Sequence, residues 1–196
     1  MRVARPWIQL GRWLLAVIFG CIVVSVFAAN GPIQPGESIP DFTLTAVRGE
    51  GFTLRADAPQ PALIAFLQTV PDTADTPSRS QVALLQSMYH QYSRRGLRVA
   101  IVDATALASG HKPDRGSLIN ASYDWNLQIP LLEDESGRVA QMLGVTHAPA
   151  VILVDAHGIV ANVWLGRVAP GELATAIEKV LGGGPLAPGS TPQRAK

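Results

Sequence analysis

The chain alternates between short apolar runs and longer segments in which apolar residues recur at helical spacing. Residues Ala62–Leu67 form a continuous apolar run, and Leu97–Val102 form a second run in which Arg98 is the one polar residue. Runs of this kind are typical of strands that are covered on both faces. Upstream, Phe42–Thr45 alternates apolar and polar residues as a half-buried strand does, and Phe52–Leu54 follows it after the turn Arg48–Gly51. The pattern therefore predicts a short hairpin ahead of the buried strands.

A helix is predicted between the two apolar runs. Its apolar stripe recurs at helical spacing and consists of Val82, Leu85, Tyr89 and Tyr92. Two starts fit the sequence. Either Thr76 caps the helix with Pro77 at the first helical position, or Ser78 caps it with Gln81 three residues later. Gly96 ends the helix after two arginines, whose charges suit a helix C-terminus.

The second half of the chain repeats this alternation. Helices are predicted at Asp114–Tyr123, Ser136–Leu143 and Pro170–Leu181. Strands are predicted at Ala150–Val154 and Ile159–Leu165, joined by the tight turn Asp155–Gly158. Residues Ile129–Leu132 are extended, and Pro130 predicts an edge position or the start of a strand there. Strands that alternate with helices in this way predict an α/β fold with a central mixed β-sheet flanked by helices.

The N-terminal residues 1–30 follow a different pattern. Arg2, Arg5 and Arg12 come before an uncharged apolar stretch from Trp13 to Ala29. Its length lies between that of a signal-peptide core and that of a full membrane span. Two interpretations therefore stay open, a cleaved signal peptide and an N-terminal single-pass transmembrane anchor. Because the arginines precede the stretch, the rest of the chain is predicted on the extracytoplasmic, periplasmic side of the membrane.

Composition predicts one domain with short extensions. Residues 31–40, rich in Pro and Gly, are predicted as a linker, residues 41–182 as the domain, and residues 183–196 as a disordered tail. A chain of 196 residues with 47% hydrophobic content is long enough for one well-buried core. The net charge of +1 gives no case for nucleic acid. The single cysteine, Cys21, lies in the apolar N-terminal stretch, so no structural disulfide is expected.

Four segments in order carry a resemblance to a known family. They are Gly36–Leu44, Phe66–Thr69, Leu132–Val145 and Gly144–Val160. The first matches a G-x-x-x-P-D-F-x-L opening, and the second matches the strand before a redox loop. The third matches a D-x-x-G helix, and the fourth matches a cis-proline strand with its hairpin. This succession resembles the redoxin branch of the thioredoxin superfamily, which includes TlpA-like and AhpC/TSA proteins. The resemblance implies a thioredoxin-like fold with an N-terminal β-hairpin extension. It also implies a cis peptide bond at Pro149, which exposes the preceding backbone for pairing with a bound partner.

The redox loop of that family is present here without its cysteines. In the register set by Phe66 and Thr69, the Cys-x-x-Cys positions hold Pro71 and Ala74, and a register shifted by one residue, as in Sco-type copper chaperones, holds Val70 and Ala74. Neither register supplies the thiolate that dithiol exchange needs. Ser78 stands at the place of a peroxidatic cysteine, but a hydroxyl is not oxidised as a thiolate is, and Ser78 is interpreted as a helix cap. We expect a vestigial redox loop of Val70, Pro71, Asp72, Thr73, Ala74 and Ser78.

Other side chains near the loop are candidates to replace the thiols. The resemblance places His147, two residues before Pro149, near Asp72 and Asp75. A histidine with two carboxylates could hold a metal or polarise a water molecule. Their spacing matches no recognised ligand motif, so the sequence predicts no metal, no cofactor and no catalytic residue.

The leading hypothesis is an exported thioredoxin-fold module that binds a partner without dithiol activity. The resemblance implies a groove at Thr76, His147, Ala148 and Pro149, where main-chain pairing needs no cysteine. The expected partner is an extracytoplasmic protein or an extended polypeptide segment. The membrane is a further expected partner if the N-terminal segment is retained.

Two alternatives to this hypothesis stay open. The first is a thioredoxin-family oxidoreductase or antioxidant protein that uses non-cysteine or partner-supplied chemistry, which needs His147 beside Asp72 or Asp75. The second is a carrier of hydrophobic small molecules, which needs an apolar pocket beneath the loop.

Overall fold

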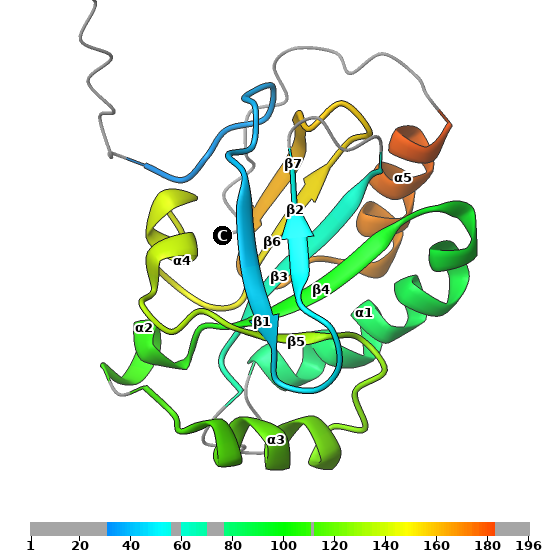
Figure 1. The fold of residues 1–196 in the computed structure, drawn as a ribbon. Coiled ribbons are helices and arrows are strands. Elements are labelled where there is room, and N and C mark those ends of the chain that lie inside the picture. The colour runs from blue at the N-terminus through cyan, green and yellow to red at the C-terminus, as the bar shows by residue number, and fades with distance from the viewer. Residues whose placement is uncertain (1–30, 56–59, 70–76, 111, 183–196) are drawn as a thin grey trace, which may run out of the picture.

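The described part of the chain forms one mixed β-sheet flanked by helices. The computed structural model describes residues 31–55, 60–69, 77–110 and 112–182 (Figure 1). The sheet has seven strands in the order β2-β1-β5-β4-β3-β6-β7. The inner strand β3 pairs in parallel with β4 and antiparallel with β6, which confirms the predicted mixed sheet. The strands are β1 (Phe42–Ala46), β2 (Phe52–Leu54), β3 (Ala62–Leu67), β4 (Arg98–Asp103), β5 (Leu131–Glu133), β6 (Ala150–Val154) and β7 (Val160–Leu165).

The helices agree with the predicted ones except at two places. They are α1 (Pro77–Tyr92), the 3₁₀ helix η1 (Ser93–Arg95), α2 (Thr105–Ser109), α3 (Arg115–Asp124), α4 (Arg138–Met142) and α5 (Pro170–Leu181). The one-turn helix α2 was not predicted. Helix α4 starts later than the predicted Ser136, because Gly137 donates a 3.0 Å hydrogen bond to the carbonyl of Asp134 in a turn and adopts a positive φ of 64°.

The predicted N-terminal hairpin is present and joins the main sheet. Strands β1 and β2 pair antiparallel, and β1 pairs with β5 on its other side. Pro130 lies just before β5, where its carbonyl accepts a 3.0 Å hydrogen bond from Ile101. Because β5 lies between β1 and β4, the predicted edge position is wrong and the predicted strand start is right. A proline outside the paired residues removes no donor from the ladder.

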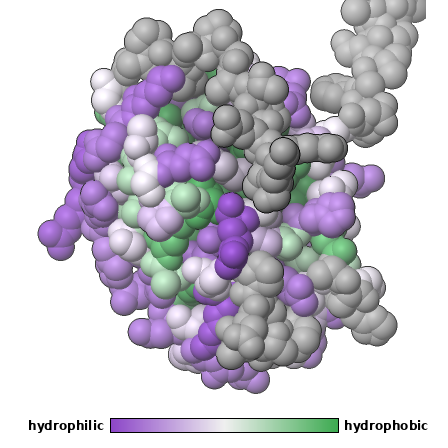
Figure 2. Space-filling view, turned by 180° about the vertical axis from the view of Figure 1, so that it is seen from behind, coloured by the Kyte–Doolittle hydropathy of each residue, from purple (hydrophilic) through white to green (hydrophobic). Residues whose placement is uncertain are grey.

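Strand β3 divides the core into two layers. Leu63, Ala65 and Leu67 are buried on the face that also buries residues of α1, α3 and α5. The alternate residues Ala62, Ile64 and Phe66 are buried on the face that carries the hairpin and α4. The view from behind shows hydrophilic side chains over most of the described surface, with apolar surface in smaller areas among them (Figure 2). The apolar run of β3 is thus buried on both faces, as the pattern indicated.

Helix α1 begins at Pro77, in agreement with the first of the two predicted starts. Its buried apolar residues are Val82, Leu85, Met88 and Tyr92, each at most 5% exposed. Tyr89, which was predicted in the stripe, is only partly buried. The spacing of three and then four residues allows either Met88 or Tyr89 to continue the stripe, and packing selects the methionine.

Residues 31–39, part of the predicted linker, have no helix or strand but are bound to the domain. Ile33 and Ile39 are buried in the core layer that carries α4. Gly36 donates a 2.8 Å hydrogen bond to the carbonyl of Val160, and the amide of Val160 donates one of 2.9 Å back to Glu37. We call residues 31–39 the strap, because they cross from α4 to the start of β7.

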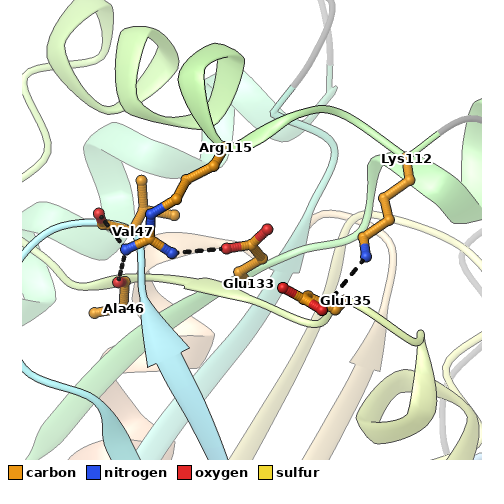
Figure 3. A network of polar contacts seen from close by, with 6 residues as sticks. All are labelled: Ala46, Val47, Lys112, Arg115, Glu133 and Glu135. Atoms are coloured by element: carbon orange, nitrogen blue, oxygen red, sulfur yellow. Dashed lines mark hydrogen bonds and ion pairs between the residues drawn. The ribbon is translucent and has the colours of Figure 1, made fainter.

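A polar cluster fixes one margin of the sheet. Arg115, the first residue of α3, contacts Glu133 of β5 and the carbonyls of Ala46 and Val47 at the end of β1 (Figure 3). Among the helices of the described ranges, none is long and apolar enough to cross a membrane. The predicted N-terminal segment and the predicted tail lie outside those ranges.

Candidate functional site

Three segments meet at one end of the sheet. Leu67, the last residue of β3, lies beside Asp103, the last residue of β4. On the other side of β3, Phe66 pairs with Ala150, the first residue of β6. The segment before β6 therefore lies next to the end of β3, where the sequence resemblance expects a redox loop. The loop residues Val70, Pro71, Asp72, Thr73 and Ala74, together with Asp75 and Thr76, lie outside the described residues.

The peptide bond between Ala148 and Pro149 is cis, which confirms the expectation from the resemblance. Pro149 is buried, and its carbonyl accepts a 2.8 Å hydrogen bond from Gly166 after β7. Ala148 is half-buried, and within the described ranges neither its N–H nor its carbonyl has a hydrogen-bond partner. Strand β6 lies between β3 and β7, so this open backbone is at the end of an inner strand and not along an edge of the sheet.

His147 lies beside this backbone and faces solvent. Its side chain is exposed, and its Nδ1 lies 2.9 Å from the hydroxyl of Thr146. In the described part of the chain, no three His, Cys, Asp or Glu side chains are grouped so that they could hold a metal ion. Asp72 and Asp75, the two carboxylates that a metal or water site at His147 would need, lie outside that part.

Ser78 has a different role from the predicted one. It is the second residue of α1 and only 2% exposed, and its hydroxyl accepts a 2.9 Å hydrogen bond from the amide of Gln68, just beyond β3. Gln81, its predicted partner in a capping box, instead accepts a 3.1 Å hydrogen bond from the amide of Val168. The interpretation of Ser78 as a cap of α1 is therefore wrong. The hydroxyl ties the end of β3 to the first turn of α1, because an amide near a buried strand end needs an acceptor.

A buried polar network at the same end was missed by sequence reasoning. Thr69 is fully buried, and its hydroxyl donates a 2.5 Å hydrogen bond to Oδ1 of Asp103. The hydroxyl of Thr105 donates to the same oxygen at 2.6 Å and accepts a 3.2 Å bond from the amide of Thr69. Polar residues directly after two apolar runs were the available signal. The network fixes the chain where it leaves β3 toward the loop.

A small cavity lined by described residues lies at this end of the sheet. Its volume is about 30 Å³, and Asp103, Ala104, Glu133 and Asp134 are among the residues that line it. That volume holds about one water molecule. An open groove of about 640 Å³ lies elsewhere, between the hairpin and α4, and is lined by Thr43, Thr53, Arg55 and Arg138 among others. Neither of these two is the apolar pocket beneath the loop that the carrier hypothesis needs, and the loop residues lie outside the described ranges.

The groups that the described residues present at this end are open backbone and polar side chains other than thiols. A half-buried residue with an open N–H and an open carbonyl can pair with an extended chain in the manner of an added strand. The family resemblance assigns its two thiol positions to Pro71 and Ala74 of this sequence, and neither side chain ionises. The ordered groups around the site are hydroxyls, one carboxylate and one exposed imidazole.

The mixed sheet flanked by helices, with a cis-proline at the start of β6, defines a protein of the thioredoxin fold. The family model for the AhpC/TSA family matches residues 35–163, and the chain belongs to this family. The match runs from the strap, through the hairpin and the site, into β7. This match confirms the predicted membership of the redoxin branch of the thioredoxin superfamily.

Two curated relatives are similar over most of their length. The thioredoxin-like protein YneN of Bacillus subtilis is 26% identical over 141 residues, which cover 72% of this chain and 77% of that protein. The thiol-disulfide oxidoreductase ResA of Halalkalibacterium halodurans is 25% identical over 168 residues, or 83% and 87% of the two chains.

Solved structures show the same fold. A putative thiol:disulfide interchange protein DsbE from Chlorobium tepidum superposes with a TM-score of 0.63 at 20% identity, over 76% of this chain and 99% of that one. A hypothetical protein from Sinorhizobium meliloti gives a TM-score of 0.65 at 22% identity, over 81% and 90% of the two chains. Both confirm the predicted thioredoxin-like fold class.

Proposed function

We propose that this chain is an exported thioredoxin-fold binding module that holds an extended segment of a partner polypeptide without dithiol chemistry. The observation that carries the proposal is the open backbone of Ala148 beside the cis bond to Pro149. Two main-chain hydrogen bonds at one residue can fix an extended chain in register, and they require no particular side chain. The proposed groove also includes His147 and Thr76.

The similarity to these relatives supports the location of the proposed site. The side chains of this chain do not support dithiol chemistry there. ResA is named a thiol-disulfide oxidoreductase, and such an activity requires a thiolate attacking a disulfide. In this chain Pro71 and Ala74 occupy the two positions, and Cys21 belongs to the apolar segment at the N-terminus. A partner polypeptide that the relatives would process is thus proposed to be bound here and released unchanged.

Export is part of the proposal. Three arginines precede the apolar stretch Trp13–Ala29, which supports an extracytoplasmic domain and a partner protein in that compartment. Cleavage of the stretch and its retention as an anchor are distinguished by N-terminal sequencing of the protein from membrane and periplasmic fractions.

Dithiol activity is tested with a revertant. The full chain and its Pro71→Cys/Ala74→Cys variant, both carrying Cys21→Ser, are assayed for reduction of insulin disulfides and of a hydroperoxide. We expect the parent to be inactive and the revertant to reduce insulin, because the two substitutions restore the Cys-x-x-Cys spacing that the family resemblance implies for this loop. Activity of the parent would contradict the proposal and favour the alternative oxidoreductase, with His147, Asp72 and Asp75 as the residues to substitute.

Binding is tested with the single variant Pro71→Cys in the same Cys21→Ser background. A lone thiol traps bound chains as mixed disulfides, so short peptides with one activated cysteine serve as probes. Ala148→Pro removes the N–H donor and should reduce the rate of trapping about tenfold, the equivalent of roughly 1.4 kcal/mol. Ala148→Gly keeps the donor and should trap at the parent rate. Equal rates for Ala148→Pro and the parent would exclude main-chain pairing at this residue.

A further inference from the structure

The strap, residues 31–39, is attached to the domain at both of its ends. Near its start, the amide of Ile33 donates a 3.0 Å hydrogen bond to the carbonyl of Leu143, just after α4. Near its end, Ile39 donates a 2.8 Å bond to Gly158, and Ser38 forms a bridge with Ile159. Ile33 and Ile39 are buried together with Leu143, so the attachment combines apolar packing with backbone hydrogen bonds.

Gly144 lies directly under the start of the strap. A Cβ atom on Gly144 would lie 1.9 Å from the carbonyl oxygen of Gly31 and 2.7 Å from the Cα of Pro32. Both are backbone atoms, so no rotation of a side chain relieves the clash. The position also has a φ of 62°, which favours glycine in any case. The strap therefore reaches its place only because residue 144 has no side chain.

Gly144 is also the first residue of the segment that leads into the candidate site. Val145 follows it, is 3% exposed, and donates a 2.8 Å hydrogen bond to Ala140 of α4. Thr146 and His147 are exposed, and Ala148 and Pro149 complete the approach to β6. The segment is thus held at one end by the contact between α4 and the strap, and at the other end by the pairing of β6.

We propose that the strap positions the backbone of Ala148, so that its release from Leu143 and Gly144 alters the site. Ile33 and Gly144 are then positioning residues, which touch no bound chain themselves. This inference rests on the proposed function in that it assigns the strap a role in the same site.

Amide hydrogen exchange on the full chain tests the inference without any partner. Gly144→Ala should release the strap and speed exchange of the hydrogen-bonded amides of Ile33, Val145 and Gly166 about tenfold, while amides of β3 are unchanged. The amide of Gly166 reports on the approach to β6, because it donates to the carbonyl of Pro149. Gly137→Ala is the matched control. Gly137 has nearly the same φ, 64°, but nothing lies within 4 Å of its added Cβ, so it carries the backbone strain without the clash.

A second variant separates the strap from the segment that contains Gly144. Ile33→Ser removes the buried anchor of the strap and leaves residues 144–149 unaltered. We expect faster exchange at the amides of Val145 and Gly166 in this variant too, with β3 unchanged. If the amide of residue 33 exchanges faster while Val145 and Gly166 keep the parent rate, the strap does not position the site and the inference is overturned. Because exchange requires no bound peptide, failure of the binding assay leaves this result independent.

Discussion

Arg115 and Glu133 are joined by a 2.9 Å hydrogen bond between Nη1 and Oε2 (Figure 3). The other nitrogen of the same guanidinium, Nη2, donates to the carbonyls of Ala46 and Val47 at 3.0 and 3.1 Å. One side chain therefore connects the start of α3, the end of β1 and the end of β5. The carboxylate side chain of Glu133 is only 11% exposed, so water replaces this contact poorly. The planar fork of arginine suits three acceptors in different directions, as a lysine ammonium does not.

We predict that Arg115→Met lowers the free energy of unfolding by about 1–3 kcal/mol, because it leaves two carbonyls and a nearly buried carboxylate without their donor. Urea unfolding measures the change. Lys112→Met is the control, since Lys112 lies 4.0 Å from Glu135 and both side chains are largely exposed. That variant should change stability by less than about 0.5 kcal/mol. Equal losses in the two variants would mean that the Arg115 contacts contribute nothing specific.

A second prediction concerns the hydroxyl of Ser78. Ser78→Ala deprives the amide of Gln68 of its acceptor at the end of β3 and should cost about 1–2 kcal/mol. Ser117→Ala is a matched control, because Ser117 also lies in the first turn of a helix but is bonded to Asp114 at an exposed site. It should cost less than about 0.5 kcal/mol. If Ser78→Ala is equally mild in urea unfolding, the contact with Gln68 does not secure the start of α1.

A third prediction concerns the network behind the loop. Thr69→Val keeps the shape of the side chain but removes the hydroxyl that donates to Asp103, and it should cost about 1–3 kcal/mol. Thr43→Val, in the exposed pair with Thr53, removes a comparable hydroxyl and should be nearly neutral. Thermal unfolding compares the two. A neutral Thr69→Val would show that the buried hydroxyl contributes no net stability.

The sequence predicted the elements that rest on local pattern. The apolar run Ala62–Leu67 and the segment Pro170–Leu181 have in the structure the bounds that were expected of them. The position of β5 between β1 and β4 was not predictable in this way, because strand order depends on contacts between distant segments. For the same reason the attachment of the strap was not predicted. Its prolines and glycines indicate a linker, although the side chains of Ile33 and Ile39 are buried in the core.

The site was predicted in part, and from resemblance more than from pattern. The motif around Pro149 correctly implied a cis bond. Ser78 was assigned to a cap because its neighbours in sequence fit one, whereas its partner is the amide of Gln68 across the loop. The role of Asp103 as an acceptor for Thr69 and Thr105 was missed, since a carboxylate after a strand can equally face solvent.

A last prediction concerns the pH dependence of stability around Glu178. Arg95 donates two hydrogen bonds to its carboxylate, at 2.7 and 2.8 Å, and they lower the pKa of Glu178 from its ordinary value of 4.5. The unfolded chain therefore binds the proton more readily than the folded one. The contribution of this pair to stability is fully present above about pH 4.5 and is lost as the pH falls through the lowered pKa.

Tyr92, which lies beside the same pair, has the opposite dependence. It is 1% exposed, and burial raises its pKa above the ordinary 10.0, with the carboxylate of Glu178 adding to the rise. The folded state then keeps the phenol proton more firmly than the unfolded state does. The resulting stability is present below pH 10 and is lost as the pH rises toward the raised pKa.

Urea midpoints measured from acid to alkaline pH test both dependences. Glu178→Gln should flatten the acid decline in part only, because hydrogen bonds from Ser117 also lower the pKa of Asp114, and its contribution remains. Tyr92→Phe should flatten the alkaline decline and reduce the acid one slightly, because the hydrogen bond from Tyr92 also contributes to the lowered pKa of Glu178. Tyr123→Phe, at a tyrosine that is 63% exposed, controls for the loss of a hydroxyl. If neither substitution alters the acid or the alkaline decline, the cluster of Tyr92, Arg95 and Glu178 does not set the pH range of stability.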